Sequence, residues 1–269
     1  MRLEGCAVTV DPVRRREDTR AMEPTVVIQS HAPSAPEIVR RASESVRAWA
    51  ASNGFDYAFK GDDLFDLIPA ACRDAAGTRM QMAADIARLA WIQALLDDGA
   101  RRVVWLDADI FVFRPDALSV DIADGYAFGR EHWVQPGKDA KLRVFNNVHN
   151  AVLVFTPEGR TTLDFYRAEA ERLLCAAGPD VPAQLVGPKL LTALHNVVRF
   201  PLLGSVGMAS PLVLDDLARG GGPAWKMLDA AHGGEMAALN LSTSLRGTTT
   251  DGVAVTDALL HAAVDNLAH

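Results

Sequence analysis

The stretch that decides the fold is RVVWLDADIFVF, at residues 102–113. Its apolar run at residues 103–106 predicts a buried strand, and the acidic triplet Asp107-Ala108-Asp109 follows where that strand ends. In an extended chain, residues i and i+2 point to the same side, so the two carboxylates are expected to converge. Ligands of open α/β sheets bind at the carboxyl ends of the strands. The segment therefore predicts a ligand site at the end of a buried strand.

The segments before this stretch predict a repeating order of strands and helices. Residues 25–31 and 55–59 predict strands, and residues 37–52 and 78–98 predict helices with apolar residues at helical spacing. Strand, helix, strand, helix, strand is the order of βαβ units. We therefore expect an α/β fold with a mostly parallel sheet and helices on both faces.

The second half of the chain carries weaker signals. Residues 126–129 and 151–155 predict short strands, and residues 161–174 and 189–196 predict helices. No internal repeat and no shift in composition marks a domain boundary. We expect one domain over residues 24–269, preceded by a loosely ordered extension at residues 1–23.

The composition is that of an ordinary globular protein, with 49% hydrophobic and 23% charged residues in a chain of 269. The net charge of −7 argues against a nucleic-acid-binding protein, which needs basic surface. The three cysteines, Cys6, Cys72 and Cys175, are far apart and suggest neither a disulfide framework nor a zinc site. We expect no signal peptide, because the apolar run near the N-terminus is short, and the sequence has no stretch of about 18 apolar residues that would span a membrane. We expect a cytoplasmic protein without a transmembrane segment.

The acidic triplet favours a divalent cation. Two hard carboxylates suit Mn²⁺ or Mg²⁺, which prefer oxygen ligands and keep positions for substrate phosphates. Such a cation would neutralise a diphosphate and help it leave. The alternative is that Asp107 and Asp109 cap a turn, with the flanking apolar residues serving only as core.

The segment Leu106-Asp107-Ala108-Asp109 resembles the DXD motif of GT-A glycosyltransferases, of the retaining type found in alpha-mannosyltransferase and capsular polysaccharide sugar-transferase groups. The resemblance covers about residues 24–200. It implies a GT-A fold and transfer of a hexose from a nucleotide diphosphate sugar, a UDP- or GDP-hexose. The acceptor would be a hydroxyl group on a glycan, a lipid-linked sugar or a small molecule.

The resemblance also implies roles for individual residues. Asp107 and Asp109 would hold the Mn²⁺ or Mg²⁺ and act in catalysis, and Asn240 stands where such enzymes often have a histidine as third ligand. Other residues would bind the nucleotide sugar: Gln29, Ser30 and His31 the base and ribose, Asp85 and Arg88 the sugar and phosphates, Asn150 the sugar, and Gly187 and Lys189 the wall of the donor pocket.

Two of these sets have structural alternatives. Asp85 and Arg88 stand at i and i+3 on a predicted helix, a spacing at which an acid–base pair stabilises the helix by itself. The segment at residues 146–150, which contains Asn146, Asn147, His149 and Asn150, also suits a polar turn, although amides are common hydrogen-bonding partners of sugar hydroxyls.

Two other functions are compatible with the same motif. In a haloacid-dehalogenase-like phosphohydrolase, Asp107 would be the nucleophile and Asp109 the general acid, with the tandem Asp215-Asp216 supplying a later metal site. Alternatively, the chain would be a nucleotide-sugar-binding protein without catalytic activity.

Overall fold

The structure of the protein is a computed structural model that describes residues 25–77, 79–178 and 181–268, so the extension expected at residues 1–23 lies outside the described residues. The strands are β1 (Thr25–Ser30), β2 (Asp56–Lys60), β3 (Arg102–Leu106), β4 (Ile110–Val112), β5 (Tyr126–Pro136), β6 (Leu142–Phe155), β7 (Leu202–Leu203), β8 (Val206–Met208), β9 (Ala238–Asn240), β10 (Thr249–Thr250) and β11 (Val253–Ala254). The α-helices are α1 (Glu37–Ser52), α2 (Ala70–Ala76), α3 (Met80–Asp97), α4 (Arg160–Ala176), α5 (Leu190–Val198), α6 (Pro211–Ala218), α7 (Pro223–Ala231) and α8 (Asp257–Leu267).

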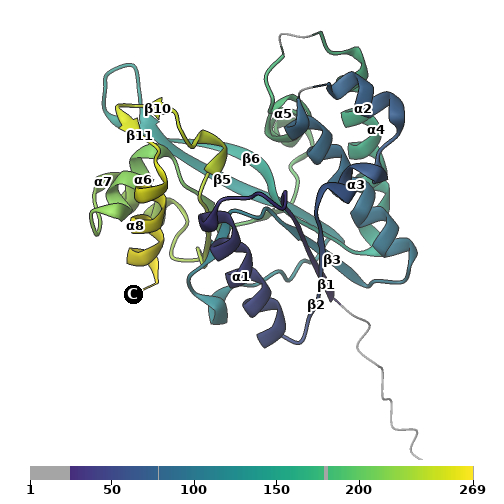
Figure 1. Cartoon of the computed structure of the whole chain (residues 1–269), viewed down its shortest axis with the longest axis horizontal. Coiled ribbons are helices and arrows are strands. Elements are labelled where there is room, and N and C mark those ends of the chain that lie inside the picture. Colours follow the sequence, from purple (N-terminus) through teal and green to yellow (C-terminus); the bar gives the residue numbers. More distant parts are fainter. Residues whose placement is uncertain (1–24, 78, 179–180, 269) are drawn as a thin grey trace, which may run out of the picture.

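A central sheet crosses the molecule with the strand order β2-β1-β3-β6-β5-β7 (Figure 1). Strands β2, β1 and β3 are parallel, β6 is antiparallel to both β3 and β5, and β7 is parallel to β5. Within the described residues, β6 is thus the single strand of this sheet that runs in the reverse direction. The prediction of an α/β fold with a mostly parallel sheet is confirmed.

The two faces of this sheet are covered by different helices. Ile28 and Trp105 point to one face, where they pack in a core with residues of α3 and α4. Val27 and Val104 point to the other face, where they pack with Trp49 of α1 and with residues of a smaller sheet. Successive residues of a strand face opposite sides, so these uniformly apolar strands are buried on both. Helices lie on both faces, as the sequence predicts.

The predicted helices of the first half form with nearly the expected bounds. Helix α1 occupies residues 37–52, and α3 ends at Asp97 shortly before Gly99. Gly54 and Gly99 have φ of 67° and 97°, a backbone conformation that glycine adopts without a steric cost. Each helix is therefore stopped by a local signal that is visible in the sequence.

The second half differs most from the prediction at β5 and β6. The short strands expected at residues 126–129 and 151–155 are the ends of a long antiparallel ribbon, paired down to Pro136 and Leu142. Polar residues dominate its outer part, which is why no apolar run marks it. Residues 146–150 lie within β6, so the polar turn considered for this segment does not form.

The C-terminal part forms a second layer beside the ribbon. Helices α6, α7 and α8 lie close together in this part of the molecule (Figure 1). They share a core with residues of a three-stranded sheet that has the order β4-β9-β8. Strand β4 directly follows the acidic triplet and pairs with β9, with Ile110 opposite Asn240. This pairing brings the late part of the chain to the triplet. Within the described residues, no helix is both long and apolar enough to cross a membrane.

Candidate functional site

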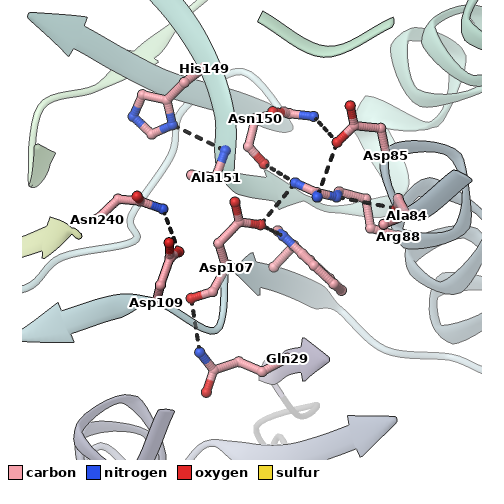
Figure 2. A network of polar contacts seen from close by, with 11 residues as sticks. Gln29, Ala84, Asp85, Arg88, Asp107, Asp109, His149, Asn150, Ala151 and Asn240 are labelled. Atoms are coloured by element: carbon pink, nitrogen blue, oxygen red, sulfur yellow. Dashed lines mark hydrogen bonds and ion pairs between the residues drawn. The ribbon is translucent and has the colours of Figure 1, made fainter. Parts of the chain in front are cut away.

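The acidic triplet forms a turn between β3 and β4 and is not extended. The Ile110 amide donates a hydrogen bond to the Asp107 carbonyl oxygen at 3.0 Å, the i to i+3 bond of a tight turn. The expectation that the carboxylates converge through the i, i+2 alternation of a strand is therefore wrong in its geometry. Both side chains nevertheless line one cavity of about 1320 Å³, and each is held by a different part of the chain (Figure 2).

Asp107 is held by a buried cation. Its Oδ1 accepts hydrogen bonds from Arg88 Nη1 at 2.9 Å and Trp105 Nε1 at 2.7 Å. The guanidinium also lies over the Trp105 ring, 4.7 Å from its centroid, and donates to the Asn150 carbonyl oxygen at 2.8 Å. Burial raises the pKa of Asp107 to about 7, against the lowering effect of Arg88 and with a further rise from the charge of Asp109.

The same guanidinium connects Asp107 to a second buried carboxylate. Arg88 Nη2 lies 3.0 Å from Asp85 Oδ1, and Asn150 Nδ2 donates to the same oxygen at 2.8 Å. Burial raises the pKa of Asp85, opposed by the charge of Arg88 and the hydrogen bond from Asn150. Asp85 and Arg88 are only 3% and 6% exposed, so they are not a surface pair that stabilises a helix. They line the cavity as part of one ionic network.

Gly187 closes over this network without lining the cavity. A side-chain carbon at this position would lie 2.8 Å from Asn150 Nδ2 and 2.9 Å from Asp85 Oδ2, so only glycine leaves room for the pair. It belongs to a π-helical turn, Leu185–Lys189, in which its φ of −104° and ψ of −112° depart from helical values. Lys189, at the end of that turn, does line the cavity.

Asp109 is held by neutral donors from the C-terminal part. Asn240 Nδ2 donates to its Oδ1 at 2.7 Å, and the amide and hydroxyl of Thr243 both donate to its Oδ2 at 2.9 Å. The Oδ1 of Asn240 accepts the Ser242 amide at 2.8 Å. Asn240 therefore orients Asp109 with its amide nitrogen while its oxygen is engaged elsewhere.

Both carboxylates keep acceptor positions that no described donor uses. A carboxylate offers about four acceptor positions. Asp107 uses two of them, both on Oδ1, and Asp109 uses three. Within the described residues no group of three or more His, Cys, Asp or Glu is placed to hold a metal ion. Mg²⁺ commonly binds through one or two carboxylates, with waters and substrate phosphates completing its shell, so two suffice.

The end of β1 contributes two of its three expected residues to the cavity. Ser30 and His31 line it, and the His31 ring packs edge-on against Phe59 with 4.7 Å between the centroids. Gln29 is fully buried and does not line it. Its Nε2 donates to the Asp107 carbonyl oxygen at 3.2 Å (Figure 2). Its Oε1 accepts a hydrogen bond from the Tyr57 hydroxyl at 3.0 Å. Gln29 thus connects β1 to β2 and to the turn that follows β3.

A break in the register of the ribbon positions Asn150 and His149. The pairing jumps from Phe128 opposite Leu153 to Gly129 opposite His149, and such irregularities re-aim side chains. His149 packs on Gly129, where a side-chain carbon would lie 2.1 Å from its ring. Its Nδ1 accepts the Ala151 amide at 3.1 Å, and burial lowers its pKa to about 4. His149 therefore lines the cavity as a neutral ring.

The sequence does not reveal the wall that the outer ribbon adds to the cavity. The lining side chains come from alternate positions of β5 and β6: Glu131, Trp133, Gln135, Phe145 and Asn147. These residues alternate with residues of the opposite face, as in any strand. The set mixes polar and apolar side chains, so the sequence shows no regular alternation of apolar and polar residues that would predict a strand.

Asp215 and Asp216 lie away from the cavity, on α6. Asp216 Oδ2 accepts the amides of Ala224 and Trp225 at the start of α7, and Asp215 pairs with Arg219 at 2.9 Å. Neither residue lines the cavity. The later metal site that a phosphohydrolase would take from this tandem is therefore not formed beside Asp107.

The sequence matches no protein-family model and no curated protein. Two solved structures show a weak likeness to this chain. One is the crystal structure of a glycosyltransferase involved in the glycosylation of the major capsid of PBCV-1, with 10% identity and a TM-score of 0.47 over 82% of this chain and 94% of that one. Another is A197 from STIV, with 11% identity and a TM-score of 0.30 over 64% and 78%. At these values neither likeness carries an argument about activity.

Proposed function

We propose that this protein is a metal-dependent glycosyltransferase that moves a hexose from a nucleotide diphosphate sugar to a hydroxyl acceptor, with retention at the anomeric carbon. The observation that carries the proposal is the placement of Asp107 and Asp109 in the turn after the central strand β3, both on the wall of one large cavity. The resemblance of Leu106–Asp109 to the DXD motif supports it.

In the proposed donor site, the lining residues have different roles. Asp107 and Asp109 would hold Mn²⁺ or Mg²⁺, which supplies neutralisation of the diphosphate leaving group. Arg88 fixes the Asp107 carboxylate and adds positive charge beneath it, and Lys189 adds a second cation on the wall. Ser30 and His31 would contact the base and ribose. Local cations thus offset the net charge of −7, which is otherwise unfavourable for binding a phosphate.

The proposed reaction exchanges one bond at the anomeric carbon. The bond from this carbon to the diphosphate oxygen breaks, and a bond to the acceptor oxygen forms. The proton of the acceptor hydroxyl passes to the leaving diphosphate, so the chain itself need not supply a base.

The test compares Asp107→Asn and Asp109→Asn with Asp116→Asn, an exposed aspartate that does not line the cavity. Hydrolysis and transfer of UDP- and GDP-hexoses are measured with Mn²⁺ and with EDTA. We expect turnover to fall by at least about 100-fold in the two site variants, because they lose charge at the proposed cation site. The Asp116→Asn protein should match the wild type.

The alternatives give different results in the same assays. Nucleotide binding that is tight and unchanged by EDTA would refute the metal-bridged site. Tight binding without turnover of any donor would identify a nucleotide-sugar-binding protein instead. Trapping of a beryllium fluoride adduct on Asp107 would identify a phosphohydrolase. Retention itself is checked by NMR of the anomeric proton of the product.

A further inference from the structure

The outer β5–β6 ribbon presents two faces of different chemistry. Opposite pairs in the register, Glu131 with Asn147 and Trp133 with Phe145, share a face because cross-strand partners point the same way. All four line the cavity. The alternate residue Val134 points the other way and is fully buried in the core formed with α6, α7 and α8. One face of the ribbon thus packs in this core, and the opposite face forms a wall of the cavity.

This wall combines aromatic rings with hydrogen-bonding groups. Trp133 is partly exposed and the Phe145 ring opposite it is 39% exposed, so both rings leave surface open to the cavity. Asn147 Nδ2 donates to Glu131 Oε1 at 3.0 Å. Within the described residues, Glu131 Oε2 and the Asn147 oxygen have no protein partner. The wall therefore offers apolar faces next to free acceptors.

The charge of the wall disfavours a phosphate. The cations that line the cavity, Arg88, Lys189 and Arg246, come from α3, the turn at residues 185–189 and the segment after β9. On the ribbon wall, Glu131 offers a diphosphate no positive charge in either protonation state and repels it when ionised. An uncharged ligand with many hydroxyl groups meets no such penalty, since its hydroxyls donate to the carboxylate and amide oxygens.

The topology places this wall opposite the proposed nucleotide side. In the central sheet, β3 has β1 on one side and β6 on the other. Ser30 and His31, at the end of β1, and the ribbon therefore flank Asp107 from opposite directions. A donor that extends from β1 to the carboxylates leaves the ribbon side for the second substrate.

From these observations we propose that the cavity face of the β5–β6 ribbon is an acceptor subsite, which binds a pyranose ring of a carbohydrate by stacking on Trp133 and Phe145. The Glu131–Asn147 pair accepts hydrogen bonds from its hydroxyls. The C–H groups on one face of a pyranose suit the electron-rich face of an aromatic ring. The assignment as an acceptor site rests on the proposed function, whereas the binding of a sugar to the wall can be measured independently of it.

The experiment uses the full chain and saturation-transfer NMR with methyl glucoside, methyl galactoside and methyl mannoside as probes. We expect binding of at least one of them, weakened at least about tenfold in Trp133→Ala and in Phe145→Ala. Phe165→Ala removes a 49% exposed ring on α4 that does not line the cavity and should bind like the wild type.

A second pair of variants removes smaller side chains and controls for misfolding. Asn147→Ala should weaken sugar binding, whereas Asn146→Ala, its neighbour in β6, which does not line the cavity, should not. Thermal stabilisation by UDP or GDP with Mn²⁺ is measured on every variant and should keep its wild-type value.

Three outcomes would overturn the subsite. They are the absence of saturation transfer to any probe in the wild type, equal losses in Asn146→Ala and Asn147→Ala, and a Trp133→Ala protein that loses nucleotide but keeps sugar. The proposed function fails separately, if no nucleotide diphosphate stabilises the wild type while a pyranoside still binds to the ribbon.

Discussion

Asp107 and Asp109 lie two residues apart on the wall of one cavity, but different regions of the molecule hold them by different means. Asp107 belongs to a buried ionic network with α3 and β6, in which Arg88 joins it to Asp85. Asp109 instead receives hydrogen bonds from uncharged donors in β9 and the segment after it. Removing one partner of a buried ion pair costs about 3–5 kcal/mol, whereas a hydrogen bond from an uncharged donor to a charged group contributes about 1.5–3 kcal/mol. The two sides should therefore respond very differently to substitution.

The largest effect is expected from Arg88→Met. It keeps an unbranched chain of similar length but leaves Asp85 and Asp107 without their cation in a buried place. Breaking a buried pair in this way costs about 3–5 kcal/mol of the free energy of unfolding. Urea denaturation measures this loss, and Arg172→Met, at an exposed position of α4, should leave the midpoint unchanged. An Arg88→Met protein with an unchanged urea midpoint would show that an ionic network does not hold Asp107 in place.

The next effect is a pH dependence from Asp107. Its pKa is raised to about 7 in the folded protein, so the folded state binds this proton more tightly than the unfolded state. The protonated Asp107 therefore adds to the free energy of unfolding at low pH. The unliganded protein should lose this contribution as pH rises from about 4 through 7. Cation binding needs the ionised carboxylate, so affinity for Mn²⁺ with a nucleotide sugar should fall about tenfold per pH unit below about 7.

Calorimetric titration between pH 6 and 8 tests this dependence. The nucleotide sugar is preferred to the free nucleotide because its diphosphate has no terminal group that titrates in this range. A flat affinity profile across these values would show that Asp107 does not compete for a proton there.

The smallest effect is expected on the neutral side, from Asn240→Ala. Thr243 still holds Asp109, so the loss of stability should stay within about 1.5–3 kcal/mol, the range for one hydrogen bond to a charged group. Affinity for Mn²⁺ with the nucleotide sugar should fall about tenfold, because the carboxylate is less well oriented. Asn266→Ala removes a comparable amide that donates to the Leu217 carbonyl oxygen at 2.7 Å, away from the cavity. It should change stability but not affinity, and equal losses of affinity would argue against an orienting role for Asn240.

The first half of the fold was predictable because its signals are local. Apolar runs mark β1 and β3, helical spacing marks α1 and α3, and glycines end both helices. The full length of the β5–β6 ribbon was not predictable. A strand with one polar face shows no continuous apolar run, and the strand that pairs with it lies beyond a turn. The three-stranded sheet of β4, β9 and β8 depends on pairing across more than a hundred residues, which no local pattern encodes.

The candidate site divides in the same way. By itself, the sequence determined that two aspartates follow a buried strand and that Asp85 and Arg88 precede them on a helix, because both facts follow from local periodicity. Only the tertiary structure decided that the triplet is a turn, that Arg88 holds Asp107 and that Asn240 holds Asp109. It also decided that Gln29 is buried beneath the triplet while Trp133 lines the cavity. Hydrogen bonds and ion pairs of this kind join residues that packing brings together, and packing is set by the whole chain.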